Sequence, residues 1–494
     1  MIGYIQKITN EKERESAGKS YQYEVCSLIT AFFGNEKIRE TEEDVQFVVK
    51  LLWTEGNVSL SIEKDGEVKE WIEGICSYKT IQERRNYLKR ETYTLLSRYT
   101  GKTLPWGTLT GIRPTKIALE MLEDGKEEEE ITRYYEEEYL TTEQKAKICN
   151  KIAKKEQSLL GEFPYEDQYS LYIGIPFCPS TCLYCSFTSY PIHQYEQKTA
   201  DYLKALKKEI AYIKEAMEEK GKRLSTIYMG GGTPTALSAE QLDELLSYVR
   251  TTFELDDPNN QLLEFTVEAG RPDSITREKL KALRKNKIDR ISINPQTMKD
   301  ETLKLIGRAH TVADTKKAFL MAREEGITNI NMDIIVGLPG EDLADVTHTL
   351  EEIEQMKPES LTVHSLAIKR AANLNIQMEK YRELVKGSTN EMLLLVDECA
   401  KKLNLNPYYL YRQKNIPGNL ENVGYAKEGL ECLYNILIME EKQTIMAAGA
   451  GATSKYVYQK ENRIERAENV KNVDQYIERI DEMIERKRAL LSNS

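Results

Sequence analysis

The sequence lacks a long apolar run. No stretch approaches the roughly 20 apolar residues that a membrane-spanning helix needs. The N-terminal segment MIGYIQKITNEKERES also lacks the apolar core and the cleavage-site pattern of a signal peptide. Both absences predict a cytoplasmic protein without a membrane span.

The sequence also has no excess of positively charged residues. The 494 residues carry 69 Lys and Arg against 80 Asp and Glu, for a net charge of −11. A broadly basic surface for nucleic acid is therefore disfavoured, and we expect no nucleic-acid partner. Hydrophobic residues make up 40% of the chain and charged residues 30%. This balance predicts a folded protein with a large core, divided into about three domains.

The pattern of a disulfide framework is absent too. Eight cysteines in a chain of this length are too sparse for a small secreted domain. The five scattered ones, expected to be buried apolar residues, are Cys26, Cys76, Cys149, Cys399 and Cys432. The remaining three crowd into eight residues and need another explanation; they are Cys178, Cys182 and Cys185.

The first part of the chain, 1–160, reads as a separate α+β domain whose role the sequence does not give. Apolar residues alternate with polar ones over 58–62, and the pair Asp65-Gly66 separates this run from a second one. That pattern predicts a β-hairpin. An earlier strand is expected over 44–53 and a charged helix over 78–98.

A different rhythm begins at Ser170. Short apolar runs are expected as strands at 171–175, 226–229, 262–267, 288–293, 330–336 and 360–363. Helical patterns separate them at 195–220, 238–253, 276–285, 311–325 and 343–356. Strands that alternate with helices predict parallel strands joined by crossovers.

The fold class predicted from this rhythm is α/β. We expect a partial (β/α)6, TIM-like barrel over 165–375, preceded by the α+β domain and followed over 376–494 by a mainly helical domain. Chemistry in such barrels sits at the carboxyl ends of the strands.

The three crowded cysteines form a C-x3-C-x2-C run directly after the first barrel strand. Three thiolates on one loop can hold three corners of a cube-shaped iron–sulfur cluster or part of a zinc tetrahedron. Zinc would need a fourth ligand, such as His193 or a distant cysteine, and zinc sites more often pair two C-x2-C elements. A 4Fe–4S cluster held by three cysteines leaves one iron open for chemistry.

This run resembles the signature of the radical S-adenosylmethionine superfamily. The resemblance implies that the open iron chelates the amino and carboxylate groups of the methionine moiety. It also implies that an electron, from a donor such as flavodoxin or ferredoxin, cleaves the sulfonium to give a 5′-deoxyadenosyl radical. The cofactors expected on this basis are a 4Fe–4S cluster and S-adenosylmethionine.

Neighbouring motifs narrow the resemblance. The segments YIGIPFC at 172–178, GGGTP at 230–234 and GLPG at 337–340 are similar to the oxygen-independent coproporphyrinogen III oxidase family. This family includes HemN dehydrogenases, HemW haem chaperones and the HemZ branch. The segments HSLAIKR at 364–370 and YYLYRQKNIPGNLENVGYA at 408–426 look most like the HemZ branch.

The resemblance also implies site residues. Cys178, Cys182 and Cys185 would hold the cluster. The contacts with S-adenosylmethionine would come from Tyr172, Tyr184, Gly231, Gly232, Thr233, Glu268, Gln296, Arg308, Asp333 and Ala367. These residue types suit the ligand, because glycines let it approach the backbone and an arginine suits its carboxylate. Arg308 as a surface ion pair and Asp333 as a helix cap are the alternatives. His364 ends the last strand and should face the barrel mouth.

The reaction implied is oxidative decarboxylation of two propionate side chains of coproporphyrinogen III, giving protoporphyrinogen IX. Two departures from the dehydrogenases matter: Phe187 replaces their fourth cysteine, as in the chaperone branch, and Gly174 replaces a histidine. The alternatives are a haem chaperone and an anaerobic haem-degrading radical enzyme. Lys369, Arg370 and Arg412 are candidate partners for the propionates.

Overall fold

The computed structural model describes most of the chain. The residues outside its description are 10–19, 35, 55, 112, 162, 368–371, 382, 386, 388, 414–419, 462 and 493–494. Among the described residues, no helix has both the length and the apolar character that a membrane crossing requires.

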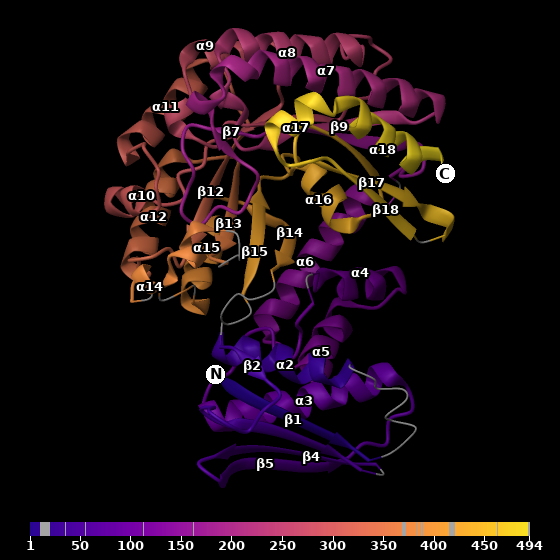
Figure 1. Cartoon of the computed structure of the whole chain (residues 1–494), viewed down its shortest axis with the longest axis vertical. Helices are drawn as coiled ribbons and strands as arrows, with labels where there is room; N and C mark the ends of the chain where they lie inside the picture. The colour runs from indigo at the N-terminus through magenta and orange to yellow at the C-terminus, as the bar shows by residue number, and fades with distance from the viewer. Residues whose placement is uncertain are drawn as a thin grey trace.

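The N-terminal residues form a five-stranded sheet in the order β2-β1-β3-β4-β5. Its strands are β1 (Ile2–Ile8), β2 (Ile38–Arg39), β3 (Val48–Trp53), β4 (Asn57–Lys64) and β5 (Glu67–Ile75). Helices α2 (Ser20–Phe33) and α3 (Ile81–Thr100) pack on it and share a hydrophobic core with it. This unit lies at the bottom of Figure 1.

The predicted hairpin is confirmed. Strands β4 and β5 pair antiparallel around Asp65 and Gly66, whose φ angles of 54° and 78° suit a tight two-residue turn. The strand expected over 44–53 begins only at Val48. Sequence patterns did not indicate β1 or α2, which complete the sheet and its cover.

Three helices lead to the barrel: α4 (Thr115–Glu123), α5 (Glu128–Tyr139) and α6 (Glu143–Leu160). Their buried side chains belong to the same hydrophobic core as the barrel strands, rather than to the core of the N-terminal sheet. Figure 1 shows them between the N-terminal sheet and the barrel. The division of the chain near residue 160 remains a prediction.

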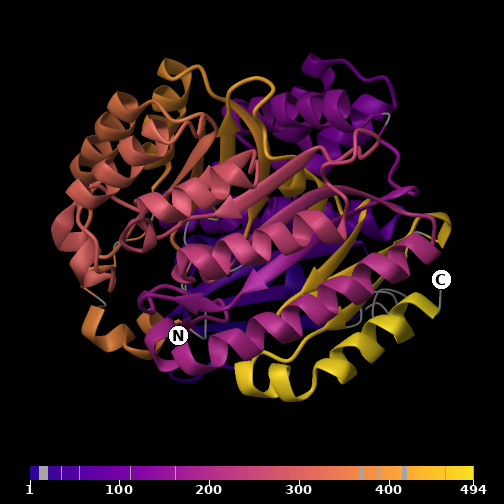
Figure 2. The same ribbon diagram turned by 90° about the horizontal axis from the view of Figure 1, so that it is seen from above.

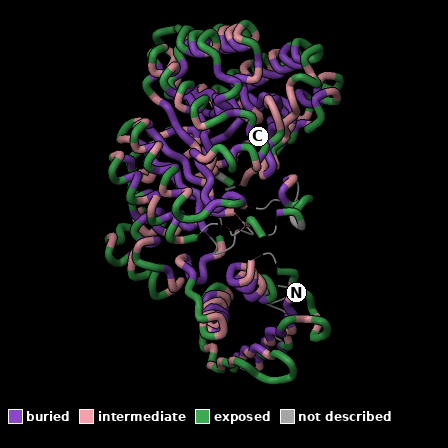
Figure 3. Tube along the Cα trace, turned by 90° about the vertical axis from the view of Figure 1, so that its left-hand side faces the viewer, coloured by how far each residue is buried: buried purple, intermediate pink, exposed green. Residues whose placement is uncertain are grey.

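The barrel rhythm is confirmed. Six parallel strands lie side by side in chain order: β6 (Gln168–Ile175), β9 (Arg223–Gly231), β10 (Glu264–Glu268), β11 (Arg290–Ser292), β12 (Ile330–Val336) and β13 (Ser360–Ser365). The crossover helices are α7 (Glu196–Glu219), α8 (Ala239–Thr252), α9 (Arg277–Lys285), α10 (Asp300–Leu305), α11 (Val312–Glu324) and α12 (Leu343–Met356). Figure 3 shows buried residues gathered in the strands and exposed ones on the outer turns of the helices.

The C-terminal residues form strands as well as helices, which corrects the prediction of a mainly helical domain. They form helices α15 (Asn390–Lys402), α16 (Leu433–Glu440), α17 (Val473–Glu478) and α18 (Ile480–Ser492). They also add five strands: β14 (Asn406–Arg412), β15 (Glu421–Ala426), β16 (Thr444–Ala448), β17 (Thr453–Tyr458) and β18 (Arg463–Glu468). Strand β16 is buried throughout, and such a strand lacks the alternation that identifies strands in a sequence.

These added strands continue the barrel sheet at both edges. Strand β15 pairs antiparallel with β13, and β16 pairs parallel with β6, which gives an 11-stranded sheet. The six-stranded barrel core therefore has no free edge, because the end of the chain covers its first and its last strand.

A buried ion pair anchors the end of the chain. Helix α18 lies along α7, as Figure 2 shows, and Lys487 of α18 bonds Glu209 of α7 with both side chains fully buried. Glu209 also accepts hydrogen bonds from the Tyr476 hydroxyl and, at 2.9 Å, from the Gly449 backbone N–H. The pair thereby fixes the loop that follows β16.

Candidate active site

A cavity opens at the carboxyl ends of the barrel strands. We call it the mouth cavity; its volume is about 230 Å³ and it is open to solvent. The predicted site residues in its lining are Cys178, Cys182, Tyr184, Cys185, Gly231, Gly232, Glu268, Gln296, Arg308, Asp333 and Ala367. His364 lines it as well, as its place at the end of β13 predicts. Segments far apart in the sequence thus converge on one space.

Two predicted contacts lie elsewhere. Thr233 is fully buried, and its backbone N–H donates to the Phe177 carbonyl at 2.7 Å, so it fixes the glycine-rich turn. Tyr172 lines a neighbouring cavity, and its ring stacks 6.3 Å from that of Tyr228. Their contact with a nucleotide remains a prediction.

The cysteine loop is docked on the segment that precedes Arg308. The Leu183 N–H donates to the Ile306 carbonyl at 2.9 Å, and the Ser180 hydroxyl donates to the Gly307 carbonyl at 3.0 Å. A side chain at Gly307 would place its Cβ 3.3 Å from the Thr181 carbonyl oxygen, so glycine suits this close approach.

Burial disfavours the charged thiolate form of the loop cysteines. It raises the pKa of Cys178 to about 12, while the positive charges of Arg271 and Arg308 lower it, and burial also raises the pKa of Cys185. Across the described residues, no three His, Cys, Asp or Glu side chains stand close enough to hold one metal ion. Ligands of a cube-shaped cluster bind different iron atoms, so a cluster does not require the three thiols to surround one ion.

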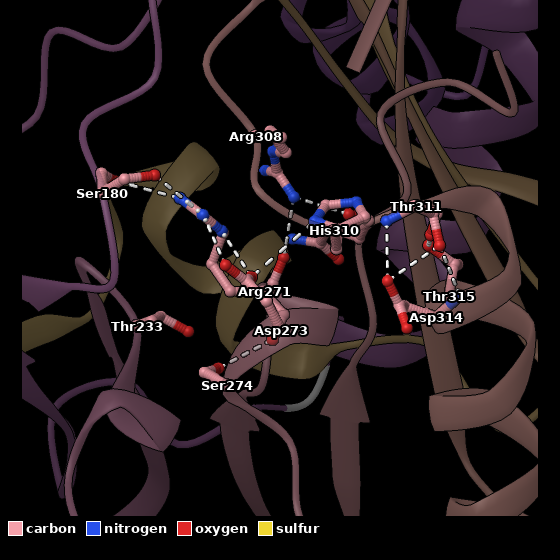
Figure 4. Close-up of polar contacts among 12 residues, drawn as sticks. Ser180, Thr233, Arg271, Asp273, Ser274, Arg308, His310, Thr311, Asp314 and Thr315 are labelled. Carbon is pink, nitrogen blue, oxygen red and sulfur yellow. Dashed lines mark hydrogen bonds and ion pairs between the residues drawn. The ribbon is translucent and has the colours of Figure 1, made fainter. Parts of the chain in front are cut away.

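Arg271 is a site residue that sequence reasoning missed. It follows β10, is 3% exposed, and forms a bidentate pair with Asp273 at 3.0 and 2.8 Å. Its guanidinium also donates to the Ser180 carbonyl at 2.9 Å and to the Ser180 hydroxyl at 3.0 Å (Figure 4). The buried ring of His310 faces Asp273 from the other side, with Nδ1 3.7 Å from its carboxylate. No sequence pattern indicates that Arg271, Asp273 and His310 come together in the fold.

Arg308 is buried rather than part of a surface ion pair. Its guanidinium donates to the Asn294 carbonyl at 2.8 Å and to the Tyr184 hydroxyl at 3.2 Å. Its Nε is buried without a hydrogen-bond partner in the described structure. Arg308 lines the mouth cavity, and a buried donor without a partner, on a guanidinium, suits a site for an anionic ligand group.

Glu268 ends β10 beneath the glycine-rich turn. The Tyr228 hydroxyl donates to its carboxylate at 2.7 Å. Burial raises the pKa of Glu268 to about 7, against the lowering effect of this hydrogen bond. A Cβ at Gly230 would come 2.8 Å from the carboxyl carbon of Glu268. A larger residue at position 230 would therefore displace the Glu268 side chain.

Gln296, in the segment after β11, and Asp333, in β12, both line the cavity. Gln296 has the left-handed φ of 67°, unusual for this residue type, and its buried Oε1 finds no partner among the described residues. Such strain and such an unpaired acceptor are typical of ligand sites. Asp333 lies within β12, is not a helix cap, and accepts a hydrogen bond from Asn331. His364 Nε2 is 4.0 Å from its carboxylate.

The predicted cationic partners of the propionates are not confirmed. Arg412 is buried away from the mouth cavity, donates to the Leu109 carbonyl at 2.7 Å, and lies 5.2 Å from the Trp106 ring. Lys369 and Arg370 lie outside the described residues. His193, a candidate zinc ligand, is exposed and does not line the cavity.

Comparison with known proteins assigns the family. Residues 172–353 match the model of the radical SAM superfamily. The chain is 40% identical to the oxygen-independent coproporphyrinogen-III oxidase-like protein HemZ of Bacillus subtilis, over 94% of this chain and 92% of that protein. The chain belongs to the HemZ family. Its radical SAM domain is the barrel that carries the cysteine loop.

Other relatives of this HemZ-family protein match a smaller part of it. The haem chaperone HemW of Bacillus subtilis is 34% identical over 57% of this chain and 70% of that protein. The solved structure of the HemN coproporphyrinogen III oxidase from Escherichia coli is 22% identical, with a TM-score of 0.48, over 65% of this chain and 71% of that chain.

Radical SAM proteins use a 4Fe–4S cluster and S-adenosylmethionine, and these are the cofactors of this HemZ-family protein. The residues present fit them. Three thiols share one docked loop, and the unpaired Arg308 Nε and Gln296 Oε1 offer a buried donor and a buried acceptor for the nucleotide.

Proposed function

We propose that this protein catalyses the oxygen-independent oxidative decarboxylation of coproporphyrinogen III to protoporphyrinogen IX. The observation that carries the proposal is the convergence of the cysteine loop, the glycine-rich turn and the strand-end polar residues on the mouth cavity. The full-length similarity to a coproporphyrinogen-III oxidase-like protein supports the choice of substrate.

When bound, the cluster and S-adenosylmethionine would supply the radical chemistry that removes a hydrogen atom from a propionate side chain. The propionate then loses CO2 and one electron, which a one-electron acceptor takes up, and a vinyl group remains. The chain's own residues bind and orient the nucleotide. We assign Arg308 to its carboxylate, Glu268 to its amine or ribose hydroxyls, and Asp333 to ribose hydroxyls.

A haem chaperone is the second candidate. Phe187, which is 70% exposed at the rim of the mouth cavity, stands where the dehydrogenases have a fourth cysteine. The similarity to HemW extends over 57% of this chain. A chaperone would keep the cluster but bind and transfer haem.

Anaerobic product analysis separates the two functions. Reduced protein with S-adenosylmethionine and coproporphyrinogen III is expected to release CO2 and form protoporphyrinogen IX, detected by chromatography after oxidation to the porphyrins. Protein that cleaves S-adenosylmethionine, forms no protoporphyrinogen and transfers haem to an acceptor would contradict the proposal in favour of the chaperone.

Arg308→Ala is expected to weaken binding of S-adenosylmethionine about 10- to 150-fold, because a lost charged hydrogen bond costs roughly 1.5–3 kcal/mol. Calorimetric titration of the cluster-loaded protein measures the effect. Iron content serves as the control, since Arg308 also bonds Tyr184, which lies within the cysteine loop. Unchanged affinity at full iron content would show that Arg308 does not bind the nucleotide.

A further inference from the structure

The contact of interest joins Arg271 to a cluster ligand. Arg271 Nη1 lies 3.6 Å from Cys182 Sγ in hydrogen-bonding geometry, and both side chains are buried. The same guanidinium donates hydrogen bonds to the carbonyl and the hydroxyl of Ser180, two residues before Cys182. Figure 4 shows Arg271 between Ser180 and Asp273.

The positive charge of Arg271 is expected to affect the reduction potential of the cluster. A cluster held by thiolates gains one negative charge when it is reduced. A nearby cation and a hydrogen bond to a ligating sulfur stabilise the reduced form, and both raise the reduction potential. Because Cys182 and Arg271 are 8% and 3% exposed, solvent screens this interaction little.

Asp273 reduces the effect of the positive charge of Arg271. Its carboxylate forms a bidentate pair with Arg271 and cancels part of the positive charge that the cluster experiences. The two residues thus have opposite effects on the charge beside Cys182.

We propose that Arg271 is a positioning residue that raises the reduction potential of the cluster through its hydrogen bond to Cys182, and that Asp273 limits the increase. The inference goes beyond the proposed function, because it depends on the cluster and not on the substrate. Iron content, measured alongside, tests the cluster separately.

The test compares midpoint potentials of the full-length, cluster-loaded protein by redox titration monitored with electron paramagnetic resonance. Arg271→Gln is expected to lower the ratio of reduced to oxidised cluster at a given potential about tenfold, which is a shift of the midpoint of about 59 mV to more negative values for one electron. Asp273→Asn is expected to move the midpoint in the opposite direction.

Ser180→Ala is the matched control. It removes the hydroxyl that accepts from Arg271 and donates to the Gly307 carbonyl, but leaves the contact between Arg271 and Cys182. Its midpoint potential should equal that of the wild type.

Unchanged midpoints in Arg271→Gln and Asp273→Asn at full iron content would overturn the proposal. An equal shift in Ser180→Ala would also overturn it, since loop movement would then account for the effect. If Arg271→Gln fails to hold iron, Asp273→Asn decides alone: a positive shift supports the proposal, and no shift overturns it.

Discussion

Replacing Cys182 by alanine will remove the 4Fe–4S cluster and abolish cleavage of S-adenosylmethionine. Cys182 is the middle ligand of the loop, is buried, and accepts the hydrogen bond from Arg271. Two thiolates alone leave a second iron without a protein ligand. Wild-type protein purified without oxygen should be brown and contain about four iron and four sulfide per chain. Iron and sulfide analysis and the yield of 5′-deoxyadenosine measure the loss.

Cys26→Ala is the control for this prediction. Cys26 lies on α2 in the N-terminal unit and is half-buried. Its replacement should leave iron content and nucleotide cleavage unchanged. Colourless wild-type protein with stoichiometric zinc would contradict the radical SAM assignment of the cysteine loop.

Lys487→Met should destabilise the barrel by about 3–5 kcal/mol, because it leaves the Glu209 carboxylate buried without its cation. Urea unfolding followed by circular dichroism measures the change in the free energy of unfolding. The cost arises from the unpaired charge rather than from lost volume, since methionine is similar to lysine in size.

Lys208→Met provides a matched comparison on the same helix pair. Lys208 of α7 bonds Asp481 of α18, but their side chains are 52% and 81% exposed. Exposed pairs contribute little, so this variant should unfold like the wild type. Equal destabilisation by the two substitutions would show that burial of the Lys487 pair does not matter.

Sequence patterns predicted those site residues that lie on the barrel strands. Glu268 closes β10 and Asp333 lies within β12, and the carboxyl ends of parallel strands meet at one edge of the sheet. Their convergence on the mouth cavity therefore followed from the rhythm of strands and helices. The cysteine spacing identified the loop for a similar reason, because its chemistry is local in sequence.

Contacts that depend on the folded chain could not be predicted in this way. Arg271 meets Ser180 only because the loop after β6 folds across the end of β10. The pairing of Lys487 with Glu209 joins two helices that the sequence separates by most of the barrel. Strand β16 was missed because a fully buried strand has the same apolar pattern as a buried helical turn.

The pairing of β6 with β16 has a consequence for synthesis on the ribosome. Tyr169 in the first barrel strand finds its partner Thr444 only after residue 444 has emerged. Until then β6 exposes unpaired backbone N–H and C=O groups along one side, which is a template for pairing with other nascent chains. Such long-range pairing also slows folding. The barrel edge at β6 therefore stays open to incorrect partners until residues 444–448 have been synthesised and have paired with it.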